Sequence, residues 1–447
     1  MTDGPLRGQH FAISPGTAAG ACARTLATCL GADVTDDGDD LGLAGSSASI
    51  DWATSGAMAL TGRADSPPRL VDGAPASVVR AALALLGTPT SAGVQVLGER
   101  AAAAGLGRRA PWSPGGAFRM VRARDGWLGL SLARDSDLDL LPALVGADVQ
   151  DPWSALEGWA GSQSVAAAEE RGTLLGLPMS AVPVAGDSRR APVLATRGGG
   201  RASDSRVVLD LTSLWAGPLC AHLLGETGAR VIKVESADRI DGARRGPSAF
   251  FDLLHAGHES VVLDFGTESG RAALAGLIDA ADLVLEAARP RALEQLGVDA
   301  AEVVASGTSW VSITAYGRDE ANALRVGFGD DVAASAGLVC WDGDRPIPVG
   351  DAIADPLAGV VAAAAAAAAL ASRDAWLLDV SMHDVAALAA SVPPDGAELF
   401  QTADAEWQVQ AGEQRVAVAE PAIRPAKSAA ATAGRDTDSV LAEFAPS

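Results

Sequence analysis

The stretch RVVLDLTSLWAGPLCAHLLGETGARVIKVES, residues 206–236, decides the fold. Its apolar run at 207–211 is typical of a buried strand, and 219–226 has the pattern of a helix. Gly228 suits the end of that helix, and the run at 230–234 is a second strand. A strand, a helix and a strand in this order predict two parallel strands joined by a crossover helix.

The alternation continues toward the C-terminus. Apolar, β-branched runs at 260–265, 281–287 and 309–317 predict further strands, and ESGRAALAGLIDA at 268–280 is one of the helical stretches between them. Strands that alternate with helices indicate an α/β fold with a doubly wound parallel sheet.

The rest of the chain reads differently. Residues 110–186 predict a small α+β unit with a hairpin across Asp125 and Gly126. Residues 19–34 match 216–231 at a constant offset, and 51–62 match 331–343, which indicates a shortened internal duplicate. The predicted divisions are a degenerate partial copy of the large domain at 1–96, the small domain at 97–186, a glycine-rich linker at 187–205, the large domain at 206–395 and a C-terminal extension at 396–447.

Composition excludes several classes of protein. The 447 residues carry 56 acidic and 34 basic side chains, a net charge of −22, so a nucleic-acid binder is not expected. The four cysteines form no CxxC pair and predict neither a disulfide framework nor a metal site. The N-terminus lacks the pattern of a secretion signal, and the alanine run at 362–369 is too weakly apolar for a membrane span. We therefore expect a cytoplasmic protein.

The segment VGDAIADPLAGVVAAAAAAAAL, residues 349–370, joins two carboxylates to that alanine run. Asp355 followed by Pro356 predicts an N-cap with proline at the first helical position. The helix dipole there would keep the Asp355 carboxylate ionised, as a nucleophile requires. A plain capping role is the alternative for Asp355. Asp351 is expected in the preceding loop, bound to backbone amides.

These motifs resemble the family III coenzyme A (CoA) transferases, a group that includes formyl-CoA transferase, carnitine CoA-transferases and α-methylacyl-CoA racemase. The resemblance rests on the stretch at 206–236 and on SVVLDF, LVLEAARPRALEQLG, VSITAYG and DAIADPLAGVVAA, in family order across 206–392. Residues 97–186 resemble the small domain of the family, which follows the large domain there but precedes it here. The resemblance also implies a homodimer, unless the internal duplicate takes the place of a partner.

The resemblance implies that Asp355 is the catalytic nucleophile and that acyl-CoA and an organic acid are the substrates, with no permanently bound cofactor. The candidate residues for binding CoA are Ala216, Gly217, Pro218, Lys233, Glu235, Arg239, Arg244, Arg245, Arg289 and Arg291. Arginine can grip phosphate with paired donors. The glycine-rich stretch SPGGAF at 113–118 stands where the family has a mobile loop over the active site.

Departures from the family pattern keep alternatives open. Glu259 stands where the family has a basic residue, and its asparagine before the RPG motif is Ala287 here. These losses suit a degenerate homologue that binds CoA or supports another subunit. A racemase is disfavoured because GDD, Gly329-Asp330-Asp331, stands where the racemase branch has GHD with its histidine base, and His255 and His258 lie elsewhere. A dinucleotide-dependent oxidoreductase ranks lower still, since only Glu235 fits it and no GxGxxG is present.

Overall fold

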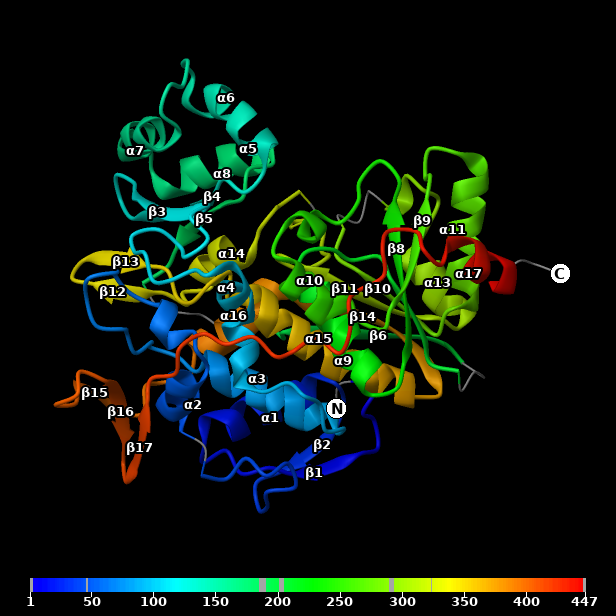
Figure 1. Ribbon diagram of the computed structural model, residues 1–447, viewed down its shortest axis with the longest axis horizontal. Helices are drawn as coiled ribbons and strands as arrows, with labels where there is room; N and C mark the ends of the chain where they lie inside the picture. Colours follow the sequence, from blue (N-terminus) through cyan, green and yellow to red (C-terminus); the bar gives the residue numbers. More distant parts are fainter. Residues whose placement is uncertain are drawn as a thin grey trace.

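A seven-stranded sheet forms the centre of the large domain. The computed structural model describes residues 3–45, 47–184, 190–200, 205–288, 293–322 and 324–444. In spatial order the strands are β6 (Val193–Gly200), β14 (Asp374–Ser381), β11 (Ser309–Thr314), β10 (Leu283–Glu286), β7 (Val207–Asp210), β8 (Arg230–Ser236) and β9 (Glu259–Leu263). The six strands from β14 to β9 are parallel, and β6 is antiparallel to β14 (Figure 1). The predicted α/β fold with a doubly wound sheet is confirmed.

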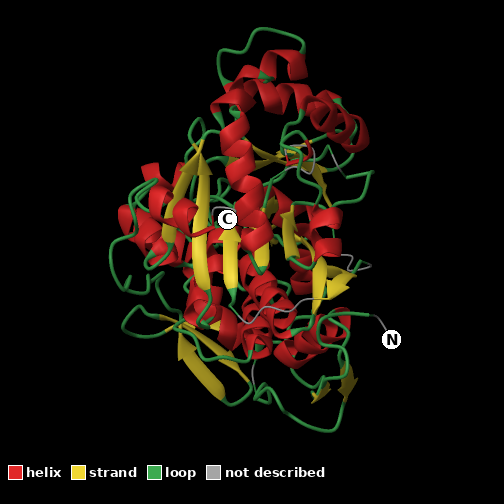
Figure 2. Ribbon diagram, turned by 90° about the vertical axis from the view of Figure 1, so that its right-hand side faces the viewer, coloured by secondary structure: helices red, strands yellow, loops and turns green. Residues whose placement is uncertain are grey.

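Helices cover both faces of this sheet (Figure 2). One face carries α9 (Ala216–Glu226), α15 (Ala354–Ala371) and α16 (Met382–Ala390), and the other carries α11 (Glu268–Ala280), α13 (Ala300–Ser306) and α17 (Thr437–Phe444). Successive residues of β7 alternate between the two cores: Val208 packs with the first group of helices, whereas Val207 and Leu209 pack with the second. This alternation follows from the two-residue period of a strand.

The segment predicted as a linker contains the edge strand β6. Its residues pair with β14 from Val193 opposite Val380 to Gly200 opposite Asp374. A Cβ atom on Gly198 would lie 2.3 Å from the Val304 side chain, so the glycines allow β6 to lie directly against α13. The linker prediction for 187–205 is wrong at 193–200, because glycine serves close backbone approach there rather than flexibility.

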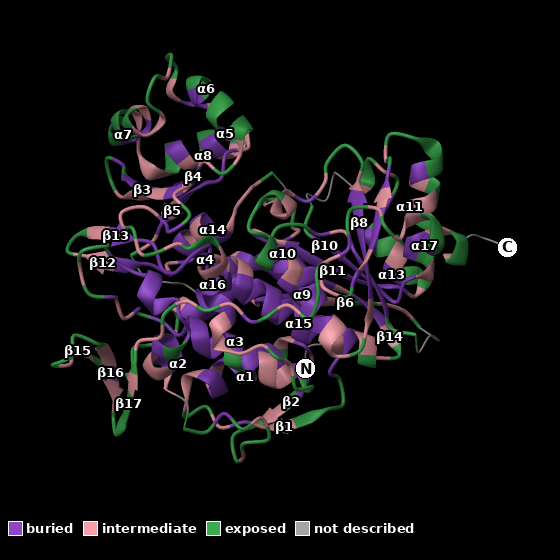
Figure 3. Cartoon of the chain, viewed as in Figure 1, coloured by how far each residue is buried: buried purple, intermediate pink, exposed green. Residues whose placement is uncertain are grey.

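The alanine-rich helix α15 lies at the centre of the first core, where it packs against α9 and against α3 (Pro75–Leu86) (Figure 3). It is long and apolar enough to cross a membrane, yet most of it is buried inside the protein. A Cβ atom on Gly359 would lie 2.6 Å from the carbonyl oxygen of Ala216, so glycine is required where α15 meets α9. Small side chains thus let three helices approach closely.

The N-terminal region contains a small version of the same arrangement. Strands β1 (His10–Ala12) and β2 (Asp33–Thr35) are parallel and are joined by α1 (Ala18–Cys29). Helix α3 packs on α1 as α15 packs on α9, and α3 and α15 also contact each other. The matched segments therefore form similar β-α-β units, although the duplication itself stays a prediction.

The small domain is a three-stranded antiparallel sheet with helices over it, at the upper left of Figure 1. Its strands are β3 (Phe118–Arg122), β4 (Trp127–Ser131) and β5 (Met179–Val182), and Arg122 pairs with Trp127 across the predicted hairpin turn. Its helices are α5 (Asp135–Asp139), α6 (Leu141–Val145), α7 (Pro152–Ser162) and α8 (Val165–Leu175).

The remaining elements connect these parts. They are the helices α2 (Ala48–Thr54), α4 (Glu99–Ala104), α10 (Ser248–His255) and α14 (Gly329–Ser335), the hairpin β12 (Cys340–Asp342) and β13 (Arg345–Ile347), the sheet of β15 (Glu398–Gln401), β16 (Trp407–Ala411) and β17 (Gln414–Ala417), and the 3₁₀ helices η1 (Met58–Leu60), η2 (Val94–Leu97) and η3 (Gly242–Arg245).

Gly359→Ala tests the contact between α9 and α15. The added methyl group meets a backbone oxygen that cannot rotate away, so we expect a loss of about 1–3 kcal/mol in the free energy of unfolding. Gly276→Ala is the control, because Gly276 lies in α11 and its Cβ would meet nothing nearer than 4.0 Å. That variant should be neutral or gain about 0.5–1 kcal/mol from helix propensity. Equal urea midpoints for the two variants would contradict this packing.

Candidate active site

Asp355 lies in the first turn of α15, as its second residue, and it is partly exposed. The predicted N-cap position is wrong: Ile353 already has helical angles and stands before Ala354, the first residue of the helix. The bend into the helix is made by Ala352, whose φ of 44° lies in the left-handed region that is costly for a residue with a Cβ. The Asp355 amide donates to the Ala352 carbonyl at 3.0 Å. The carboxylate therefore still sits at the positive end of the helix dipole.

Asp351 forms a bidentate ion pair with Arg100 of α4. Arg100 Nε donates to Oδ2 at 2.9 Å and Nη2 donates to Oδ1 at 2.5 Å. The Asp351 side chain is fully buried, whereas that of Arg100 keeps 33% exposure. The Gly115 amide also bonds Asp351, so the predicted bonding to backbone is present but is secondary to the arginine. Sequence reasoning missed Arg100, which is 251 residues away and carries no local signal of its partner.

Asp330 of α14 holds the strained bend in place. The Ala352 amide donates to Asp330 Oδ1 at 2.8 Å. Gly329 beside it faces the same bend: a Cβ there would lie 2.2 Å from the Ala352 oxygen and 2.3 Å from Asp355 Oδ2. The glycine therefore lets α14 begin directly against the Asp355 carboxylate. Gly329 and Asp330 thus both contact the bend before α15. They are the two residues that stand where racemases have glycine and histidine.

The pKa of Asp355 is raised to about 7. Burial is the largest cause, and the neighbouring Asp330 and Asp351 add to it, while Arg100 and the Gly329 amide act in the opposite direction. Burial together with Asp351 also raises the pKa of Asp330 to about 6. The prediction that the helix dipole keeps Asp355 ionised therefore holds only in part at neutral pH, because desolvation raises its pKa despite the dipole.

The glycine-rich stretch at 113–118 reaches this cluster. A Cβ on Gly115 would lie 3.2 Å from Arg100 Nη2 and 3.6 Å from Asp351 Oδ1. The Arg100 guanidinium also lies 5.6 Å from the centre of the Trp215 ring. The segment 97–186, through Arg100 and Gly115, and the large domain thus both contribute to one cluster of residues.

The predicted turn residues Ala216, Gly217 and Pro218 are buried at the start of α9. A Cβ on Gly217 would lie 2.2 Å from the Thr212 side chain, so this turn packs tightly on the end of β7. The strand order reverses between β7 and β10, and the loops after such strands form the usual ligand crevice of a doubly wound sheet. Arg289 and Arg291 follow β10 and lie outside the described residues.

The other predicted CoA-binding residues divide into two groups. Lys233 is buried and lies 3.0 Å from Asp241 and 3.7 Å from Asp210, and Glu235 is bonded by Arg244 at 2.5 Å. These side chains hold the ends of β7 and β8 together, which leaves little capacity for a ligand. Glu235 is likewise engaged and does not present a free acid for a dinucleotide ribose. Arg239 and Arg245 are exposed.

His255 and His258 do not supply a base. His255 and His258 are buried, and burial lowers the pKa of His258 to about 3. They are neutral parts of the interior, as expected when burial disfavours the charged form. Among the described residues, no group of three or more histidine, cysteine or acidic side chains is arranged to hold a metal ion.

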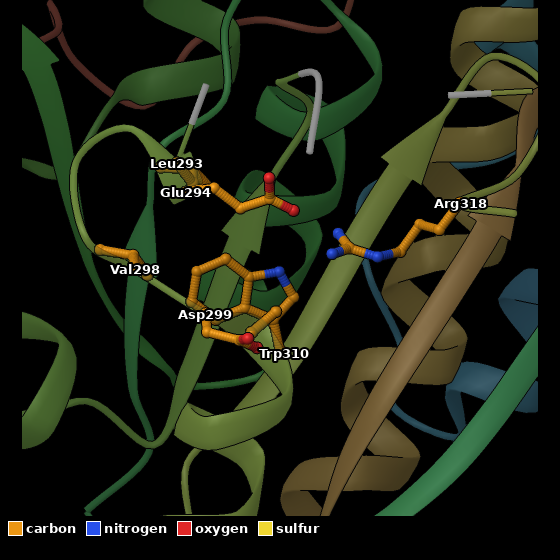
Figure 4. A pocket seen from close by; sticks show the side chains of 7 residues that line it. Leu293, Glu294, Val298, Asp299, Trp310 and Arg318 are labelled. Atoms are coloured by element: carbon orange, nitrogen blue, oxygen red, sulfur yellow. The ribbon is translucent and has the colours of Figure 1, made fainter. Parts of the chain in front are cut away.

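Two cavities lie among other residues. One of about 20 Å³ has room for about one water, and Figure 4 shows the Arg318 and Glu294 side chains pointing toward its space. A larger one, of about 390 Å³, lies between α10 and the segment 423–429 and includes Arg424. Arg424 forms a buried pair with Glu99 at 2.5 Å, and Glu99 precedes Arg100 in α4. The C-terminal segment thereby fixes the helix that carries Arg100.

Comparison with known proteins identifies relatives of part of this chain. The model of CoA-transferase family III matches residues 204–421. A succinyl-CoA–D-citramalate CoA-transferase of Chloroflexus aurantiacus is 32% identical over 212 residues, which cover 44% of this chain and 53% of the relative. A probable fatty acyl-CoA transferase of Mycobacterium tuberculosis is 33% identical and covers 40% and 50%.

A crystal structure of a hypothetical protein from Mycobacterium tuberculosis is 33% identical, covers 42% of this chain and 57% of that one, and has a TM-score of 0.38. The chain spans about half the length of the curated relatives it matches. The match contains Asp330, Asp351 and Asp355, whereas Arg100 lies outside it. Residues 204–421 match CoA-transferase family III, and the resemblance found in the sequence is confirmed for this part of the chain.

Proposed function

We propose that this protein is a CoA-transferase that moves CoA from an acyl-CoA to an organic acid through a covalent intermediate on Asp355. One observation carries the proposal: Asp355 lies in the first turn of α15, within the region that matches the family, and its carboxylate interacts with Arg100, Asp330 and Asp351. Asp355 is not the N-cap of α15, so a capping role does not explain its position.

The chemistry divides the exchange into four balanced steps. The Asp355 carboxylate attacks the thioester carbonyl of the donor and expels CoA thiolate, which leaves a mixed anhydride. The thiolate then attacks the Asp355 carbonyl, forms an aspartyl-CoA thioester and releases the donor acid. An acceptor carboxylate attacks this thioester and expels the thiolate again, and the thiolate finally attacks the acceptor carbonyl and frees Asp355. Covalent catalysis of this type replaces one difficult step by easier ones.

The electrostatics of the cluster support this role. With a pKa of about 7, Asp355 is substantially ionised at neutral pH, and incomplete solvation keeps its carboxylate reactive. The ligand crevice where the strand order reverses, between β7 and β10, is the proposed place for the CoA nucleotide. The relatives named above act on D-citramalate and on fatty acyl groups, so acids of both kinds belong in a substrate screen. The homodimer and the cytoplasmic location stay predictions.

Replacing Asp355 tests the nucleophile. Asp355→Asn keeps the shape of the side chain but removes the attacking carboxylate, so transfer from acyl-CoA to a panel of acids should fall by at least about a thousand-fold. Intact-protein mass spectrometry after mixing with acyl-CoA should show a CoA adduct on the wild type and none on the variant. Asp51→Asn, at a buried carboxylate of α2, is the control. If the wild type consumes no thioester with any donor, the degenerate alternative is correct.

The pH dependence tests the environment of Asp355. The nucleophile must be ionised, so kcat/KM should rise with pH through about 7 and level off above it. Asp330→Asn removes a negative neighbour that raises the pKa of Asp355, so the rise should move to lower pH. The asparagine oxygen can still accept from the Ala352 amide and preserve the bend. An unchanged or upward-shifted profile in this variant would contradict the assignment.

A further inference from the structure

We propose that Arg100 of α4, which lies outside the family match, binds the reacting carboxylate of the acid substrate beside Asp355. This inference rests on the proposed function and deepens it, because it assigns the anion-binding group of that same site. Arg100 would act directly on the substrate, and Asp351 would act through Arg100 as a positioning residue.

The charges of the cluster require such a group. Asp330, Asp351 and Asp355 give it three carboxylates, and an organic acid approaches neutral solution as a further anion. Arg100 is the cation with the largest effect on Asp355, and it faces all three carboxylates. Without it, the acid would enter a site of like charge, which opposes binding.

The geometry of Arg100 leaves it able to bind. Its Nε and Nη2 atoms are both used by Asp351, and among the described residues the structure gives Nη1 no hydrogen-bond partner. The side chain keeps 33% exposure although Asp351 is fully buried. The bidentate pair fixes the plane of the guanidinium, and the Trp215 ring lies 5.6 Å from its centre. A guanidinium fixed on one edge offers its remaining donors without a further loss of rotamer freedom.

The approach of the loop at 113–118 fits this role. Gly115 lies next to Nη2, and any side chain there would begin 3.2 Å from that atom and 3.9 Å from Nη1. Glycine therefore adds no side chain beside the guanidinium, which lets the loop lie against its Nη2 edge.

Arg100→Gln separates binding of the acid from the earlier steps. Transfer to a carboxylate acceptor should lose about 10- to 100-fold in kcat/KM, mostly through KM, which is the scale of a lost hydrogen bond to a charged group. Hydroxylamine is a neutral nucleophile that attacks the acyl carbonyl of the mixed anhydride, releases a hydroxamate and frees Asp355. Removing Arg100 also raises the pKa of Asp355, so the two proteins are compared on the alkaline plateau of the pH profile. There, hydroxamate formation should continue at a rate near that of the wild type.

Three further variants keep the test decisive. Arg100→Gln with Asp351→Asn leaves no unpaired buried charge and should show the same selective loss, and Arg100→Lys should recover part of it. Arg80→Gln is the matched control, because Arg80 also pairs with a buried aspartate, at 2.7 Å, and should leave both activities unchanged. Loss of hydroxamate formation together with transfer, in the double variant, would overturn the inference in favour of a structural role.

The choice of acid and a binding measurement complete the test. Butyrate and succinate should lose equally in Arg100→Gln, whereas a loss confined to succinate would overturn the assignment to the reacting carboxylate. Calorimetry with succinate on Asp355→Ala measures binding without turnover, and the added Arg100→Gln should abolish it. Normal transfer by Arg100→Gln overturns this inference alone. Absence of transfer in the wild type, with succinate binding that still depends on Arg100, overturns only the proposed function.

Discussion

The close contact of α15 with α9 is the constraint on which the rest of this structure depends. Gly359 of α15 lies against the backbone oxygen of Ala216. Direct contact between the two backbones therefore sets the position of α15 relative to the turn that begins α9. Asp355 lies one turn before Gly359, and the predicted ligand turn begins at Ala216. Small residues in α15 thus fix the candidate nucleophile relative to the end of β7. The alanine run carries no reactive side chains. Its small side chains allow α15 to pack closely against both α9 and α3.

Buried charge is the second constraint, and it explains why the site needs parts that are distant in sequence. Asp351 is fully buried, and an unpaired carboxylate in that position would cost several kcal/mol. Arg100 offsets this cost only if α4 is held rigidly, and α4 is held by the buried pair of Glu99 with Arg424. A chain of ion pairs therefore runs from the C-terminal segment through α4 to the first turn of α15. Helix α4, which the family match leaves out, is thus tied to Asp355 by electrostatics.

The sheet and its helices could be predicted from the sequence, because strand and helix periods in 206–236 and in the segments that follow are local signals. The edge strand β6 could not, since its glycines at 198–200 have the composition of a linker, and only contact with α13 reveals their purpose. Asp355 and Asp351 stood out by their motif. The environment of these two residues could not be predicted. The N-cap prediction is wrong because Ala352 adopts a left-handed conformation, which a hydrogen bond to Asp330 holds in place. Lys233 and Glu235 have charged side chains at positions where a ligand could bind, but the local sequence could not show that both are paired with neighbouring residues.

The connectivity of the chain has a consequence for how the site is assembled. Arg100 and the loop at 113–118 both precede the large domain in the sequence, and α3 from the N-terminal region packs on α15. The turn, the arginine and the nucleophile are therefore brought together by folding of one continuous chain, through contacts among its described residues. A ligand that bridges Arg100 and Asp355 would stabilise the association of α4 with the large domain, since anything that binds only the folded arrangement favours it. Binding of the acid and the association of α4 with the large domain are thus coupled through Arg100 and its ion pair with Asp351.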